Sequence, residues 1–163
     1  MDGETAFLSL GSNLGKREQN LCRAAEALGS VLRKLRCSSI YETRPMYVLD
    51  QPSFLNMVVM GRSLLPPMEL LRRALGIEIQ MGRDRANHVP KGPRVIDIDI
   101  LLFGRRIIRE KELSVPHPYM KERQFVLIPL LELRPNLADP ETGRPLSESL
   151  RALDEQGVYI FSS

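Results

Sequence analysis

The stretch from Arg94 to Gly104, RVIDIDILLFG, constrains the fold of this chain more than any other. Apolar residues rich in isoleucine surround two aspartates, a pattern that favours a β-strand. Side chains alternate faces along a strand, so Asp97 and Asp99 share one face, with Cα atoms roughly 6–7 Å apart. The isoleucines point the other way, into a core. An isolated pair of this kind is also typical of an exposed strand face.

The segment before this strand gives the two aspartates a chemical context. Residues 82–94, GRDRANHVPKGPR, carry four Arg or Lys side chains, and their glycines and prolines oppose regular structure. Two close carboxylates repel each other unless a cation lies between them, and Mg²⁺ suits such oxygen ligands. Phosphoryl transfer needs metal ions and arginines around the phosphates, and a closing loop can exclude water. A solvated basic loop is the other interpretation of this segment alone.

Composition limits the class of protein. The chain has 163 residues, 43% of them apolar and 26% charged, so we expect one globular domain over 1–163. No apolar run is long enough to span a bilayer, and the first residues lack a signal-peptide pattern, so we expect a cytoplasmic protein with no membrane partner. Cys22 and Cys37 are expected to be reduced and buried. Much of the positive charge clusters in 83–94, which suits a small anionic ligand at least as well as nucleic acid.

Hydrophobic periodicity predicts the order of the elements. Strands are expected at 6–10, 35–41 and 54–61, and Ser12 or Asn13 is expected to cap the helix after the first strand. A second helix, 66–81, should bury a stripe of Met68, Leu71, Leu75 and Ile79, and the strand with the two aspartates follows. A short strand at 107–108, helices at 125–133 and 146–153 and an edge strand at 158–161 complete the chain. This βαββαβ order with a C-terminal extension predicts an α+β, ferredoxin-like sandwich with an antiparallel sheet and helices on one face.

Six motifs in order resemble the 6-hydroxymethyl-7,8-dihydropterin pyrophosphokinase family of folate biosynthesis. They are LGSNLG at 10–15, YET at 41–43 with Pro45, DQPSFLN at 50–56, GR at 82–83, GPR at 92–94 with the two aspartates, and VPHP at 115–118 with Arg123 and FVL at 125–127. The resemblance covers the chain from Leu8 to about Leu150. It implies transfer of the pyrophosphoryl group of ATP to the hydroxymethyl group of the pterin, with AMP as the other product. It also implies a functional link to dihydropteroate synthase, and no nucleic acid partner.

The resemblance assigns roles to matching residues. Two Mg²⁺ ions would be bound by Asp97 and Asp99, and the catalytic arginines would be Arg83 and Arg94. The pterin would be bound by Thr43, Arg44, Met46, Phe54, Asn56 and Phe125. ATP would be contacted by Glu78, Arg85, Lys91, Ile100, Ser114, His117 and Arg123. Lys91, Leu75 and Glu112 stand where some members have Trp, Gln and Arg, so individual nucleotide contacts should differ in this chain.

Two other functions are compatible with parts of the pattern. A ferredoxin-like sheet with basic loops is a common RNA-binding platform, but the strands here carry no aromatic RNA-binding motif and only 6% of the chain is aromatic. A different Mg²⁺-dependent phosphoryl or nucleotidyl transferase fits the aspartates and the basic loop equally well. Only the match at the pterin-binding positions favours the pyrophosphokinase over that alternative.

Overall fold

An antiparallel sheet forms the centre of the chain. The computed structural model describes residues 3–43, 52–82 and 94–162. Among these residues the main sheet has six strands in the order β5-β1-β4-β3-β8, and β2 also pairs with β4. The strands are β1 (Thr5–Ser12), β2 (Leu32–Cys37), β3 (Tyr41–Thr43), β4 (Phe54–Ser63), β5 (Asp97–Phe103) and β8 (Val158–Ile160). Their pairings are antiparallel, which confirms the predicted kind of sheet.

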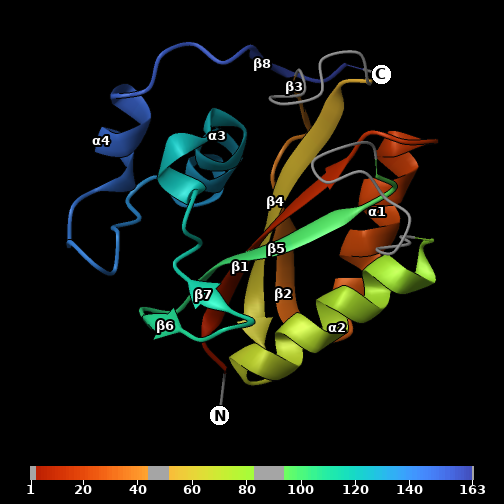
Figure 1. The fold of residues 1–163 in the computed structure, drawn as a ribbon, viewed down its shortest axis with the longest axis horizontal. Helices are drawn as coiled ribbons and strands as arrows, with labels where there is room; N and C mark the ends of the chain where they lie inside the picture. Colours follow the sequence, from red (N-terminus) through yellow and green to blue (C-terminus); the bar gives the residue numbers. More distant parts are fainter. Residues whose placement is uncertain (1–2, 44–51, 83–93, 163) are drawn as a thin grey trace.

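Helices cover both faces of this sheet. Helices α1 (Arg17–Leu28) and α2 (Pro67–Gln80) lie on one face, and α3 (Gln124–Leu133) lies on the other (Figure 1). A 3-10 turn, η1 (Met120–Glu122), precedes α3, and α4 (Leu146–Arg151) packs beside it. Strands β6 (Ile108–Arg109) and β7 (Ser114–Val115) form a separate small sheet. The expectation of helices on one face therefore holds for α1 and α2 but not for the C-terminal extension.

The alternation of side chains along the central strands explains why both faces are covered. On β1, Leu8 and Leu10 belong to the core under α1 and α2, whereas Phe7 belongs to the core under α3. On β4, Val59 belongs to the core under α1 and α2, and Val58 belongs to the core under α3. Each fully buried side chain of this size contributes about 1.5–3 kcal/mol, so both faces favour being covered.

Helix α2 buries a different stripe from the predicted one. Leu70, Ala74 and Ile77 are almost completely buried, whereas Ile79 is 63% exposed. Met68 and Leu71 are only partly buried against the same core. Positions 70, 74 and 77 have the same helical spacing as the predicted stripe, so periodicity alone could not choose between two neighbouring apolar stripes.

The first half of the chain departs from prediction at three further places. Leu32 begins β2, and the predicted strand 35–41 is replaced by two strands separated by a short connection. Lys16 is the N-cap of α1 and no side chain caps that helix, so the capping role predicted for Ser12 or Asn13 is wrong. Both cysteines are exposed rather than buried, Cys22 beside the buried stripe of α1 and Cys37 at the end of a strand.

Across the described residues, no helix has both the length and the apolar character needed to cross a bilayer.

Candidate functional site

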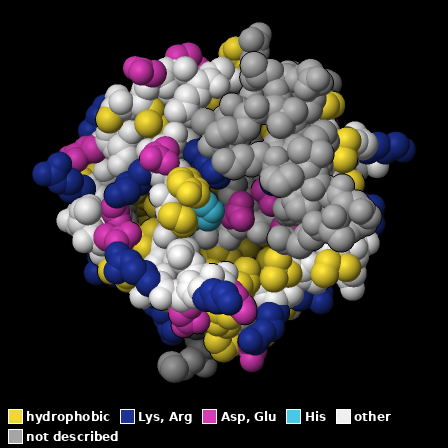
Figure 2. Space-filling model, in the orientation of Figure 1, with side chains coloured by type: hydrophobic (Ala, Val, Ile, Leu, Met, Phe, Trp, Pro, Cys, Tyr) yellow, Lys and Arg dark blue, Asp and Glu magenta, His cyan; other side chains and the backbone are white. Residues whose placement is uncertain are grey.

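A cavity opens on the α3 face of the sheet, over the ends of β5, β1, β4 and β3. Figure 2 shows a hollow near the centre of one face, where a histidine lies beside acidic side chains. The cavity is lined by Ser9, Gly11, Thr43, Phe54, Asn56, Arg94, Asp97, Asp99, Leu101, His117, Arg123, Phe125 and Val126. Most of the described residues that the sequence predicted for the site therefore lie together in one place.

Strand register brings the acidic and amide side chains into line. Gly11 on β1 lies opposite Asp97 on β5 and opposite Asn56 on β4, and Asn56 in turn lies opposite Tyr41 on β3. These residues form one row across the sheet. A Cβ atom at Gly11 would lie 3.2 Å from Oδ1 of Asn56, a tight contact that the amide would have to move to relieve. Its missing side chain leaves space between the carboxylates and the amide.

Arg94 connects the acidic side of the cavity to its aromatic side. Its Nη1 donates a hydrogen bond of 3.3 Å to Oδ2 of Asp97, and its guanidinium lies 5.9 Å from the centre of the Phe54 ring. Its backbone N–H donates to Oδ1 of Asn13 at 2.7 Å. The guanidinium therefore lies at the edge of the space between the carboxylates and the aromatic rings, where it can neutralise an incoming anion.

Two phenylalanines and an amide form the less charged part of the cavity. Phe54 comes from β4 and Phe125 from the first turn of α3. Asn56 is 3% exposed, and its Nδ2 donates to Oγ1 of Thr43 at 2.8 Å. The Arg123 guanidinium lies 5.6 Å from the centre of the Phe125 ring. A flat heteroaromatic ring with an amide-like edge matches this combination of rings and hydrogen-bonding groups.

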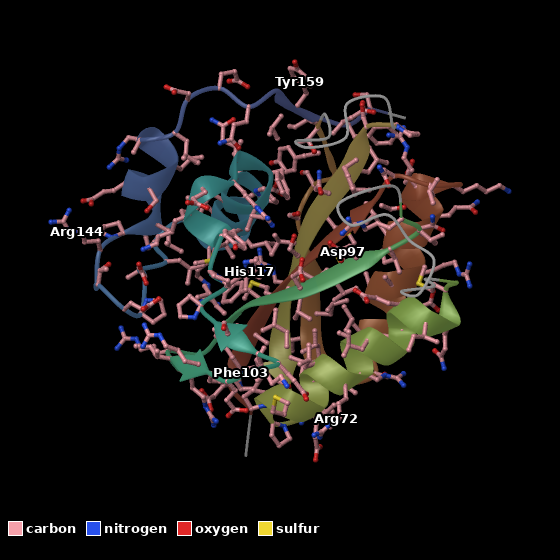
Figure 3. The ribbon with its side chains drawn as sticks, viewed as in Figure 1. Arg72, Asp97, Phe103, His117, Arg144 and Tyr159 are labelled. Carbon is pink, nitrogen blue, oxygen red and sulfur yellow. The ribbon has the colours of Figure 1, made fainter. Side chains whose placement is uncertain are left out.

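His117 is neutral and has a defined tautomer. Burial and the nearby positive charge of Arg123 lower its pKa to about 4, although Asp97 acts in the opposite direction. Its Nδ1 accepts a hydrogen bond of 3.2 Å from the backbone N–H of Tyr119, so the ring proton is on Nε2. Figure 3 places His117, on the segment before α3, close to the part of β5 that carries Asp97. The ring can therefore donate one hydrogen bond to an anion.

A second hollow adjoins the first and shares two of its residues, Asp99 and His117. Its other lining residues are Leu71, Ile98, Ile100, Lys111, Glu112, Leu113, Ser114 and Pro118. Of the residues predicted to contact ATP, Ile100 and Ser114 lie here, His117 lines both hollows, and Arg123 lies in the first cavity. Glu112, one of the departures from the family pattern, also lies here.

Glu78 lines neither of these two hollows. Its side chain is 1% exposed, and its Oε2 accepts a hydrogen bond of 2.8 Å from the backbone N–H of Ile98. It is therefore not a solvated helix residue. Its carboxylate supports the strand that carries Asp97 and Asp99, and its predicted contact with ATP stays a prediction.

The acidic pair fits a magnesium ion that is completed by phosphate and water. No group of three or more His, Cys, Asp or Glu side chains suited to a metal ion occurs within 3–43, 52–82 and 94–162. Mg²⁺ commonly uses only one or two carboxylates, with substrate phosphates and waters as its remaining ligands. Asp97 and Asp99 both face the first cavity, and Asp99 also faces the second. Their donor oxygens therefore suit ions held jointly with a polyphosphate.

Five predicted site residues lie outside the described parts of the chain: Arg44, Met46, Arg83, Arg85 and Lys91. Most of the predicted basic loop lies outside them too. Four residues that line the first cavity were not predicted as site residues: Ser9, Gly11, Leu101 and Val126. Strand alternation could have found Ser9 and Gly11, which are small residues two positions apart on β1. Leu101 lies where the pairing of β1 with β5 shifts register, and no sequence signal marks that shift.

Comparison with known proteins gives a consistent family. Residues 7–135 match the family described as 7,8-dihydro-6-hydroxymethylpterin-pyrophosphokinase (HPPK). The 2-amino-4-hydroxy-6-hydroxymethyldihydropteridine pyrophosphokinase of Bacillus subtilis is 47% identical over 158 residues, which cover 96% of this chain and 89% of that protein. The protein of the same name from Aquifex aeolicus is 40% identical over 144 residues, which cover 88% of this chain and 89% of that protein.

Longer proteins also match. Folic acid synthesis protein fol1 of Schizosaccharomyces pombe is 43% identical over 97% of this chain, but the chain spans only 22% of that protein. A crystal structure described as HPPK-DHPS in complex with substrates superposes with a TM-score of 0.73 at 16% identity, and covers 93% of this chain and 43% of that one. At that identity the superposition supports the fold alone.

Proposed function

This chain belongs to the 7,8-dihydro-6-hydroxymethylpterin-pyrophosphokinase family, and from that premise we propose that it transfers the pyrophosphoryl group of ATP to 6-hydroxymethyl-7,8-dihydropterin. The new bond joins the hydroxymethyl oxygen to the β-phosphorus of ATP. The bond from that phosphorus to the bridging oxygen of the α-phosphate breaks, AMP leaves with that oxygen, and the hydroxyl proton is released. The products are AMP and the pterin diphosphate, which serves folate biosynthesis.

One observation supports this proposal most strongly. Asp99 and His117 line both hollows, and Asp97 faces the hollow that contains the aromatic rings and Asn56. Transfer between two bound substrates requires their reacting groups to meet where charge can be neutralised. The junction of the two hollows is such a place, with the pterin in the first and the nucleoside of ATP in the second.

Two Mg²⁺ ions would be held by Asp97 and Asp99 together with the phosphates of ATP. When bound, these ions supply positive charge that neutralises the triphosphate and aligns the attacking and leaving oxygens. Arg94 already contacts Asp97 and can bind an oxygen of the transferring group, and Arg83 is proposed as the second catalytic arginine. The Nε2–H of His117 and the guanidinium of Arg123 are proposed to bind phosphate oxygens, with Arg85 and Lys91 as further contacts.

The pterin ring is proposed to lie between Phe54 and Phe125. The Nδ2 of Asn56 already donates to Thr43, so the amide Oδ1 is the acceptor best placed for the amino group of the ring. Arg44 and Met46 are proposed to complete the pocket, and Glu78, Ile100 and Ser114 to contact the nucleotide.

The family also suggests the setting in which the chain works. We infer a single domain over 1–163 with a ferredoxin-like layout, which the strand order β5-β1-β4-β3 and the position of α1 and α2 on one face support. A cytoplasmic location without nucleic acid or membrane partners is proposed from composition and charge. A functional link to dihydropteroate synthase is proposed from the HPPK-DHPS proteins that share the fold.

The test is to incubate the protein with ATP, Mg²⁺ and 6-hydroxymethyl-7,8-dihydropterin and to identify the nucleotide product. AMP formation that depends on the pterin is the expected result. ADP would indicate transfer of a single phosphoryl group, and no pterin-dependent turnover would contradict the proposal. Omission of Mg²⁺ should abolish turnover, and replacement of the pterin by its 6-methyl analogue, which lacks the hydroxyl, should prevent AMP formation.

A further inference from the structure

The C-terminal segment from Gln156 to Ile160 connects two walls of the first cavity, the one that contains Phe54 and Phe125. One wall is the first turn of α3, which carries Phe125, and the other is β3, which ends at Thr43. In Figure 1 the segment runs from α4 past α3 to reach β3 as β8. We propose that Gln156 is a positioning residue for the first cavity, because it holds the start of α3 in place relative to β3. The proposal rests on the proposed function, because the ligand used to test it is the pterin.

Gln156 makes three hydrogen bonds where η1 ends and α3 begins. Its Oε1 accepts from the backbone N–H of Gln124 at 2.9 Å, and its Nε2 donates to the backbone carbonyl of Glu122 at 3.0 Å. Its own backbone N–H donates to Oε1 of Gln124 at 2.9 Å. The two backbone groups, the carbonyl at the end of η1 and the N–H at the start of α3, lie on either side of Arg123. Gln156 therefore fixes the chain immediately before Phe125.

The N-terminus of α3 explains why these contacts matter. The first N–H groups of a helix lack partners within the helix and are usually satisfied by a capping side chain. Arg123 occupies the N-cap position and no side-chain hydrogen bond caps the helix from there. Gln156 supplies an acceptor from a distant part of the chain, 32 residues away. The orientation of the first turn thus depends on the C-terminal segment.

The same segment is anchored to the opposite wall two residues later. Val158 lies opposite Thr43 and Ile160 lies opposite Tyr41 in the antiparallel pairing of β8 with β3. Gly157 makes the short connection possible with φ of +72°, a value that favours glycine. The distance from Gln156 to Val158 is at most about 7 Å in an extended chain, so the two walls cannot separate without breaking one set of contacts.

The match to the family model ends at residue 135, before this segment begins. The residues that touch substrate are proposed to lie within the matched region. Gln156 touches none of the cavity, because it is absent from the residues that line it. Its influence on the pterin would be exerted through Phe125 and Arg123.

The experiment measures pterin affinity by calorimetry in the presence of Mg²⁺ and a non-hydrolysable ATP analogue. Gln156→Ala removes both side-chain hydrogen bonds and should weaken pterin binding about tenfold, the equivalent of one or two hydrogen bonds. Gln156→Glu keeps the acceptor for Gln124 and loses only the donor, so its affinity should be intermediate. Asp154→Ala, at an exposed position two residues before Gln156, is the matched control and should bind like the wild type.

A purely structural role predicts a different result. It would lower the midpoint of thermal unfolding but leave the dissociation constant of the folded protein unchanged. Wild-type pterin affinity in Gln156→Ala, measured well below its unfolding midpoint, would overturn the inference. If Gln156→Ala does not fold, wild-type affinity in Gln156→Glu overturns it equally. Failure of the wild-type protein itself to bind the pterin would instead refute the proposed function.

Discussion

Asn13 and Arg94, 81 residues apart in sequence, are joined by two hydrogen bonds. The Arg94 N–H donates to Oδ1 of Asn13 at 2.7 Å, and the Asn13 N–H donates to the Arg94 carbonyl at 3.1 Å. The Nδ2 of Asn13 also donates to the carbonyl of Pro52 at 3.2 Å. Asn13 thus holds together the backbone before β4 and the backbone before β5, the two strands that carry Phe54, Asn56 and the aspartates.

Asn13→Ala should impair the chemical step more than substrate binding. The substitution removes the acceptor for the partly buried N–H of Arg94, and an unsatisfied buried backbone group costs about 1–3 kcal/mol. Because Arg94 contacts the transferring group in the proposed mechanism, we expect kcat to fall by about tenfold or more. Steady-state kinetics with both substrates will measure this, with the exposed Asn136→Ala as control. An unchanged kcat would show that Arg94 keeps its position without Asn13.

Asp97→Asn and Asp99→Asn should each abolish turnover while the protein remains folded. Each change removes a charged ligand for the proposed metal ions, and asparagine preserves the size of the side chain. Each change relieves the repulsion between the carboxylates, but Asp97→Asn also weakens the ion pair with Arg94, so any loss of stability in the metal-free protein should be confined to Asp97→Asn. Product formation over a Mg²⁺ titration and thermal unfolding will check both points, with the exposed Asp154→Asn as control. Full activity of Asp97→Asn at saturating Mg²⁺ would contradict the metal assignment.

Phe54→Ala and Phe125→Ala should weaken pterin binding more than binding of ATP. Stacking between aromatic groups contributes about 0.5–1.5 kcal/mol beyond the burial of area, and each variant loses one side of the proposed stack. Phe125 also contacts the guanidinium of Arg123, so its loss should have the larger effect on ATP. Calorimetric titration with each ligand separately will distinguish the two effects. Equal losses for both ligands would mean that the rings are structural.

Glu132→Gln should lower the pKa of Tyr41 and destabilise the protein near neutral pH. The Glu132 carboxylate accepts from the Tyr41 hydroxyl at 2.6 Å and from the backbone N–H of Ser39 at 2.8 Å, which ties α3 to β3. Burial, followed by this hydrogen bond and the negative charge of Glu132, raises the pKa of Tyr41 to about 12. Glutamine keeps one acceptor oxygen but loses the charge and the second acceptor, so the free energy of unfolding should fall by about 1–3 kcal/mol.

The sign of the pH dependence follows from the raised pKa. The folded state favours the neutral phenol, so this contribution is complete below the unfolded pKa of about 10 and is lost as pH rises toward about 12. The stability difference between wild type and Glu132→Gln should therefore shrink over that interval. Phenolate absorbance and urea unfolding at several pH values will test it, with Glu148→Gln as the surface control. A difference that does not vary with pH would mean that Tyr41 is not its source.

Much of the fold and the site could be predicted from local pattern. The alternation around Asp97 and Asp99 placed both carboxylates on one face, and the isoleucines beside them are buried as expected. Periodicity located α1 and α2 because each has a marked apolar face, whereas a continuous apolar run located α3. The choice between two apolar stripes on α2 depended on the position of the sheet, which a local pattern does not contain.

The parts that were not predicted depend on contacts between distant segments. Helix α3 is apolar nearly all round, and only the tertiary structure shows that it covers the second face of the sheet. The partners of Asn13 and Gln156 lie 81 and 32 residues away, so neither interaction leaves a mark in the neighbouring sequence. Gly11 lies in one of the family motifs. The close approach of Asn56, which favours a residue without a side chain at this position, became visible only with the strand register.

Under the proposed function, the row formed by Asp97, Gly11 and Asn56 limits the length of substrate that the site can accept. Adjacent strands are about 4.8 Å apart, so the carboxylate-bearing and amide-bearing backbones are separated by about 10 Å. This spacing is a property of hydrogen-bonded strands and does not vary with side-chain substitution. Under the proposed function, analogues with a longer arm between ring and hydroxyl would place their oxygen beyond the β-phosphate. Mutating the cavity walls could change which ring is bound, but not how far the reacting oxygen must lie from it.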